Sequence, residues 1–197
     1  MSAPQEQHDD EDLRPTFAPG YKPGEQKTLD TYRELDKNDE SLNRWKASLG
    51  IDGNVPGELS GPKVTVISLT LTSPTLSTPI VMTLADKTDY KKNPITIKEG
   101  AEYAVTMTFM VNHSIVSGLR YLQVVKRTGI KLDKMDSMIG SYGPSPTPYT
   151  KVFASEEAPS GMLARSGTYT ARSRVTDDDM SVYADFEWTF KIGKEWA

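Results

Sequence analysis

The chain has 197 residues, with 23 lysines and arginines, 27 aspartates and glutamates, and no cysteine. The absence of cysteine excludes a disulfide framework, a thiolate nucleophile and a cysteine-based zinc site. No apolar run approaches the ~20 residues of a membrane-spanning helix, and the polar, acidic beginning of the chain lacks the pattern of a signal peptide. We therefore expect a soluble protein of the cytoplasm (cytosol).

Charge is unevenly distributed along the chain. Residues 1–50 carry 11 acidic and 7 basic side chains, whereas residues 51–197 carry 16 of each. Within residues 1–27, four prolines and a dense acidic cluster accompany few large apolar residues, which predicts a disordered acidic tail. The balanced remainder lacks the basic excess of a nucleic-acid-binding domain, so we expect no nucleic-acid partner.

Residues 28–50 predict an arm of two short helices. Thr28 is a suitable N-cap for the first helix, and Asp39 for the second, which Gly50 would close. The apolar side chains that recur at helical spacing are Leu29, Tyr32, Leu35, Leu42, Trp45 and Leu49. Because helices of about two turns are unstable without a partner surface, we expect the free arm to be only weakly helical.

After a linker over 51–62, apolar residues of the segment 63–197 recur with a period of two. Strands are expected near 64–73, 79–84, 94–98, 103–111, 119–127, 149–154, 168–175 and 186–192. Short strands separated by turn residues, without intervening helices, predict an all-β fold, an antiparallel β-sandwich. Its inward side chains, Met107, Phe109 and Trp188 among them, form either a plain core or the lining of an apolar binding site.

We expect no enzyme, metal site or cofactor. His113 is the only histidine outside the acidic tail, and no G-x-S-x-G motif or glycine-rich phosphate loop accompanies it. The carboxylate run Asp177–Asp179 lacks the spacing of a calcium loop. We interpret that run as an exposed turn or a protein contact, which leaves binding as the expected function.

Six runs of residues resemble the Rho GDP-dissociation inhibitors. They are YKPGEQKTLDTYRELDKNDESLNRWK (21–46), IKEGAEYAVTMTFMVNHSIVSGLRYLQ (97–123), DKMDSMIGSYGP (133–144), EEAPSGMLARSGTY (156–169), RSRVTDDDM (172–180) and FEWTFKIGKEW (186–196). The resemblance covers about residues 21–197 in order. It implies an immunoglobulin-like β-sandwich with a flexible N-terminal arm, which forms a short helical hairpin on a Rho-family GTPase.

The resemblance also implies three contact surfaces. The GTPase would be bound by Leu35, Asp39, Leu42, Trp45, Leu49, Asp178 and Asp179, with Asp39 reaching the switch I threonine. The geranylgeranyl group of the GTPase would lie among Leu71, Ile95, Tyr103, Ile115, Ala171, Trp188 and Phe190, between the two sheets. The polybasic segment before the prenylated cysteine would meet Glu156 and Glu157.

These observations predict an inhibitor that binds prenylated GTPases of the Rho, Rac and Cdc types in the GDP state. It would slow GDP release through the arm and extract the GTPase in transient competition with the membrane surface. The alternative is a prenyl-binding chaperone of the phosphodiesterase-delta type, which has no such arm and does not inhibit nucleotide release. A secreted carbohydrate-binding sandwich would need a signal peptide and a row of exposed aromatic side chains.

Overall fold

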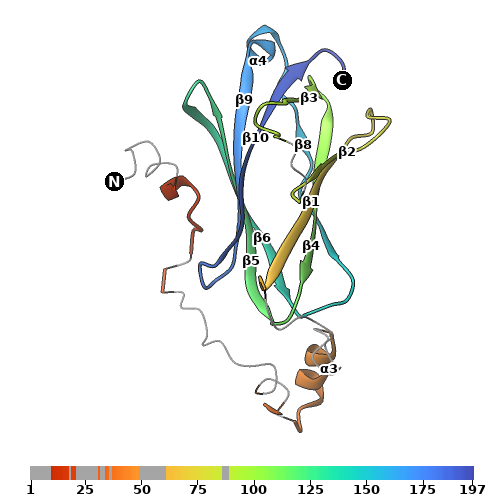
Figure 1. The fold of residues 1–197 in the computed structure, drawn as a ribbon, viewed down its shortest axis with the longest axis vertical. Helices are drawn as coiled ribbons and strands as arrows, with labels where there is room; N and C mark the ends of the chain where they lie inside the picture. Colours follow the sequence, from red (N-terminus) through yellow and green to blue (C-terminus); the bar gives the residue numbers. More distant parts are fainter. Residues whose placement is uncertain are drawn as a thin grey trace.

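The computed structural model describes residues 10–17, 19–20, 31, 34–35, 37–48, 61–85 and 89–197. Two β-sheets pack face to face, as Figure 1 shows. The strands are β1 (Val64–Thr72), β2 (Ile80–Thr83), β3 (Ile95–Lys98), β4 (Glu102–Val111), β5 (Val116–Arg127), β6 (Ile130–Tyr142), β7 (Tyr149–Val152), β8 (Glu156–Glu157), β9 (Thr168–Thr176) and β10 (Val182–Gly193). The helices with described bounds are α3 (Glu40–Ser48) and α4 (Met162–Arg165).

The strand order separates the chain into two layers. The first sheet has the order β2-β1-β4-β7, with β8 paired to β4, and the second has the order β3-β10-β9-β5-β6. Every expected strand region contains a strand, which confirms the all-β sandwich. One pairing departs from the predicted antiparallel arrangement, because β3 crosses from the first sheet to the second and joins β10 in parallel.

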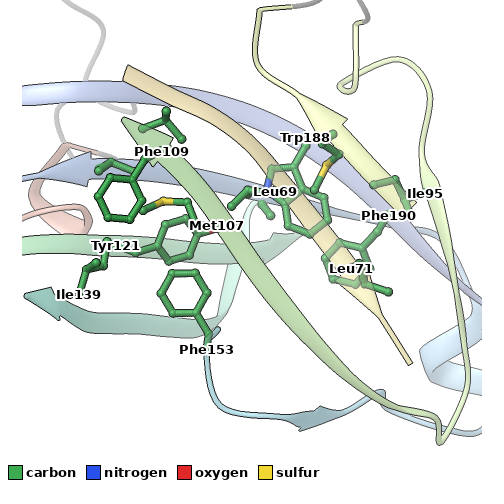
Figure 2. Packing of buried hydrophobic residues seen from close by; sticks show 14 of the residues in the cluster. Leu69, Leu71, Ile95, Met107, Phe109, Tyr121, Ile139, Phe153, Trp188 and Phe190 are labelled. Atoms are coloured by element: carbon green, nitrogen blue, oxygen red, sulfur yellow. The ribbon is translucent and has the colours of Figure 1, made fainter. Parts of the chain in front are cut away.

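The core lies between the two sheets and follows the period-two pattern of the sequence. On β4 the buried apolar side chains are Met107, Phe109 and Val111, and on β10 they are Trp188, Phe190 and Ile192. In Figure 2, Met107, Phe109, Tyr121 and Phe153 gather toward one part of this core, and Leu71, Ile95, Trp188 and Phe190 gather toward the other. Burial of these alternating faces drives the sheets together.

Three elements were not expected from the sequence. The strands β6 and β8 and the short helix α4 lie outside the strand regions that the sequence predicts. The residues of β6 are mostly exposed, so their side chains do not carry the alternation that reveals a half-buried strand. Within the described ranges, no helix has the length and apolar character that a bilayer crossing requires.

Candidate functional site

An apolar cavity of about 340 Å³ lies between the two sheets. Its walls come from both layers, because β4 and β8 contribute on one side and β5, β9 and β10 on the other. The residues that line it are Ile97, Tyr103, Val105, Tyr121, Gln123, Val125, Leu132, Asp133, Met135, Phe153, Glu156, Glu157, Ala158, Pro159, Tyr169, Trp188, Phe190 and Ile192. A cavity with this lining suits an apolar ligand.

Aromatic rings form much of the wall. The rings of Tyr169 and Phe190 stack with centroids 4.9 Å apart, and the ring centroids of Trp188 and Phe190 are 5.5 Å apart. Across the cavity, Tyr121 lies 4.8 Å from Phe153. Since each ring is held by another ring, these side chains keep their positions without a ligand and leave a preformed apolar surface.

A buried hydrogen-bond cluster satisfies the polar atoms of this wall. The Trp188 indole N–H donates to Ser173 Oγ at 3.1 Å, and the Tyr121 hydroxyl donates to Gln123 Oε1 at 2.7 Å. The Tyr121 and Ser173 hydroxyls also lie 2.8 Å apart. Burial raises the pKa of Tyr121 well above its usual range, so the phenol is neutral. The cavity therefore presents ring carbons rather than unsatisfied polar groups.

Carboxylates gather at the edge of the cavity. The Tyr103 hydroxyl donates to Glu156 Oε2 at 2.8 Å, and Glu157 and Asp133 also line the cavity. Burial, reinforced by the negative charge of Glu156, raises the pKa of Tyr103 far above its usual range. This arrangement joins an apolar interior to an acidic rim, and an acidic rim attracts a positively charged segment.

One end of the cavity wall is fastened by Arg127. Its guanidinium donates to the carbonyl of Leu163 at 2.7 Å and to the hydroxyl of Ser166 at 2.5 Å, and it lies 5.3 Å from the centroid of the Tyr169 ring. The Tyr169 hydroxyl donates to the carbonyl of Ala164 at 3.0 Å. Because Tyr169 lines the cavity, these contacts tie the α4 segment to the wall.

The structure brings together three of the seven residues assigned to the prenyl group. Tyr103, Trp188 and Phe190 line the cavity. The other four, which are not part of the lining, are Leu71, Ile95, Ala171 and Ile115. The first three of these belong to the same hydrophobic core, whereas Ile115 lies in the connection between β4 and β5. The assignment of all seven stays a prediction.

Sequence reasoning missed the contribution of β5 to the lining. Tyr121, Gln123 and Val125 alternate along this strand and all face the cavity. The alternation of Tyr121 and Val125 in the sequence could have predicted this inward face, but the polar Gln123 between them interrupts the apolar pattern. Tyr169 alternates in the same way with Ala171 on β9. Phe153 carries no comparable signal, because only the packing of the two layers brings it to the cavity.

The second helix of the predicted arm is present as α3. Asp39 Oδ1 accepts hydrogen bonds from the backbone N–H groups of Ser41 at 2.8 Å and Leu42 at 3.1 Å, which is the expected N-cap. Trp45 is 47% exposed, and Leu35 is also exposed. Leu49, residues 51–60 of the predicted linker and most of the first predicted helix lie outside the described residues. The described arm thus offers apolar side chains to a partner.

The carboxylate run after β9 divides into a structural part and a surface part. Asp177 is fully buried, accepts a hydrogen bond from the Tyr183 hydroxyl at 2.5 Å and pairs with Lys63 at 3.6 Å. Asp178 is also buried, whereas Asp179 is exposed. Of the two residues in this run that are assigned to the GTPase surface, Asp179 is the one with an exposed side chain, and both assignments stay predictions.

Several known proteins are similar to this chain in sequence. The Rho GDP-dissociation inhibitor 1 of Bos taurus is 44% identical over 177 residues, which are 89% of this chain and 86% of that protein. The Rho GDP-dissociation inhibitor of Schizosaccharomyces pombe is 41% identical over 97% of this chain and 95% of its own length. The inhibitor 1 of Arabidopsis thaliana is 41% identical over 88% of this chain.

A likeness to solved structures is weaker. A Bacteroides uniformis beta-glucuronidase matches 66% of this chain and 14% of its own, with a TM-score of 0.41 and 8% sequence identity, a level that carries no functional information. The family model described as RHO protein GDP dissociation inhibitor, in contrast, matches residues 3–195. The chain therefore belongs to the Rho GDP-dissociation inhibitor family.

Proposed function

We propose that this protein binds the GDP form of a geranylgeranylated Rho-family GTPase, slows the release of GDP and keeps the GTPase in the cytosol, away from the membrane. The observation that carries the proposal is the apolar cavity between the sheets with carboxylates at its edge. The family consists of regulators of Rho proteins rather than enzymes, which confirms that the chain is not an enzyme.

The cavity supports a lipid ligand because the polar atoms of Tyr121 and Trp188 in its wall are already hydrogen-bonded within the protein. Transfer of a hydrocarbon chain from water is worth about 0.8 kcal/mol for each buried CH₂ group, and a bilayer offers a similar gain. Extraction from a membrane therefore needs contacts beyond the lipid itself. Glu156, Glu157 and Asp133 stand at the edge of the cavity, where they can attract a basic segment that would otherwise bind anionic headgroups.

The arm supplies the second set of contacts in this proposal. Trp45 on helix α3 and Leu35 before it are exposed to solvent, and a protein surface that covers them would gain apolar burial. We place this surface on the switch regions of the GTPase, where the arm would restrain the motion that releases GDP. A prenyl-binding chaperone without nucleotide control would not need α3, so the arm favours the inhibitor over that alternative.

A charged substitution inside the cavity tests the proposal. Val125 lines the cavity and pairs in register with Asp133 on β6, so the ammonium group of a Val125→Lys variant has a carboxylate within reach and the sandwich can remain folded. The matched control is Val152→Lys on β7, because this valine is 61% exposed and outside the lining. Liposomes carrying a geranylgeranylated, GDP-bound Rho GTPase are sedimented with each protein, and the GTPase in the supernatant is measured.

The original protein and Val152→Lys should release the GTPase into a one-to-one soluble complex, and Val125→Lys should lose at least about tenfold in extraction. Undiminished extraction by a folded Val125→Lys variant would contradict the lipid assignment. Slowed GDP release from an unprenylated GTPase should persist in both variants. Extraction without any effect on GDP release would favour the chaperone alternative.

A further inference from the structure

Residues 10–17 lie against the outer face of the second sheet. Figure 1 shows this segment, red in the ribbon, on the side of β5 and β6 that faces away from the first sheet. Leu13 is only 2% exposed and forms a small hydrophobic cluster with Leu122 and Val124. This cluster is separate from the main core. Part of the region expected to be a disordered tail therefore packs on the sandwich.

The cluster exists because two apolar residues of β5 point outward. Side chains alternate along a strand, so Leu122 and Val124 face away from the cavity that Tyr121 and Val125 line. Leu122 and Val124 are nevertheless 0% and 3% exposed. Since Leu13 belongs to their cluster, burial of this outer face depends on the N-terminal segment.

Charges on both sides of the cluster complement the segment. Asp10 accepts a hydrogen bond from Arg174 at 2.5 Å and lies 3.5 Å from Arg172, and both arginines also bind Asp185 of β10. Asp10 thus adds a carboxylate at a place where two guanidinium groups already meet Asp185. The contact is therefore electrostatically matched at the start of the segment.

The second half of the segment makes contacts of the same kind. Asp12 pairs with Lys131 of β6 at 2.6 Å, and the backbone N–H of Thr16 donates to Asp136 at 3.0 Å. The guanidinium of Arg120 lies 5.4 Å from the centroid of the Phe17 ring. Contacts thus run along the whole segment, in the order acidic, apolar, polar and aromatic.

We propose that the outer face of β5, β6 and β9 is a binding site for an acidic, leucine-containing peptide segment, and that residues 10–17 of this chain are its ligand. This goes beyond the proposed action on the GTPase. Docking converts the region before β1 from a free tail into a loop that is held at both ends. A loop held at both ends has fewer conformations than a free tail, so less entropy is lost when the arm binds a partner.

Single thiols test the docking, since the natural sequence has no cysteine. Val124→Cys places a thiol under Leu13, and Ile130→Cys on β6 places a control thiol at a position that is 65% exposed. Each full-length variant is treated with Ellman's reagent, with and without the additional substitution Leu13→Asp. Leu13 belongs to the segment and not to the sandwich, so the sandwich should fold in all four proteins, as circular dichroism will verify.

We expect the thiol at 124 to react at least about tenfold faster when Leu13 is aspartate, while the thiol at 130 keeps its rate. Raised salt should also speed the reaction of the thiol at 124, because salt screens ionic contacts at the surface. The double substitution Asp10→Asn and Asp12→Asn, which removes these contacts, should speed the same reaction. An unchanged rate at 124 would overturn the proposal. Protection that rises with protein concentration would also overturn it, since the ligand would then come from a second copy.

Discussion

Asp39 offers a prediction in which two effects can be separated. Its carboxylate caps α3, a helix of only nine residues, through the backbone N–H groups of Ser41 and Leu42. Loss of such a cap costs about 1 kcal/mol, which is about fivefold in the population of the helix. If Asp39 also reaches a hydroxyl of the GTPase, loss of that charged hydrogen bond adds roughly 1.5–3 kcal/mol, or about 10- to 100-fold.

Two substitutions distinguish these effects. Asp39→Ala removes both the cap and the contact, whereas Asp39→Ser keeps a capping side chain that is too short for the contact. Release of a fluorescent GDP analogue from a Rho-family GTPase, measured against inhibitor concentration, should therefore show Asp39→Ser weakened about tenfold or more and Asp39→Ala weakened further. Glu40→Ala is the control for charge, since among the described residues of the arm Glu40 pairs with Arg44 at 4.0 Å, a distant and exposed contact.

The outcomes assign a role to Asp39. Asp39→Ser with full inhibition would refute the direct contact and leave the cap as the only function of this side chain. Asp39→Ala with full inhibition would refute both functions. In either case the sandwich should keep its stability, because the described contacts of Asp39 lie within the arm.

Two further predictions concern stability. Gly118→Ala should destabilise the protein by about 3 kcal/mol in urea unfolding, because a methyl group at φ +61° would overlap the carboxylate of Asp178. The control, Gly129→Ala, has φ +80° and open space around it, so it should cost about 1 kcal/mol. Equal losses for the two variants would show that Asp178 moves aside freely. Burial raises the pKa values of Tyr103 and Tyr121 above their usual value of 10.0, so the stability that their neutral forms supply is present below pH 10 and falls as the pH rises further. Above pH 10, the free energy of unfolding should therefore fall less steeply with pH for Tyr121→Phe than for the original protein. An identical slope for the two proteins would contradict the assignment.

The sequence predicted those parts of the fold whose side chains alternate between core and solvent. β4 and β10 could be identified because Met107, Phe109, Trp188 and Phe190 are buried at every second position. β6 could not, since it lies at the edge of its sheet and both its apolar and its charged side chains, such as Leu132 and Lys131, are exposed. Its existence depends on backbone pairing with β5, which no periodicity of side chains reports.

The candidate site was predictable to a similar extent. Trp188 and Phe190 stand on a recognisable strand, and Asp39 precedes a recognisable helix, so both positions follow from local pattern. Phe153 reaches the cavity only through the packing of the two layers. The burial of Leu13 was not predicted for a different reason. The composition of residues 1–27 as a whole indicates disorder, and a composition does not show that one leucine packs against the sheet.

The edges of the two sheets have a consequence for how the protein behaves at high concentration. Three edge strands, β2, β3 and β7, are only four residues long, which limits the backbone that another molecule can pair with. The fourth, β6, is thirteen residues long but carries Lys131, Asp133, Lys134 and Asp136. A strand from another molecule that paired with this edge would have to remove water from these charged side chains or approach charges of its own sign, and both are unfavourable. The sandwich can thus hold an open apolar cavity while its margins resist strand-by-strand polymerisation.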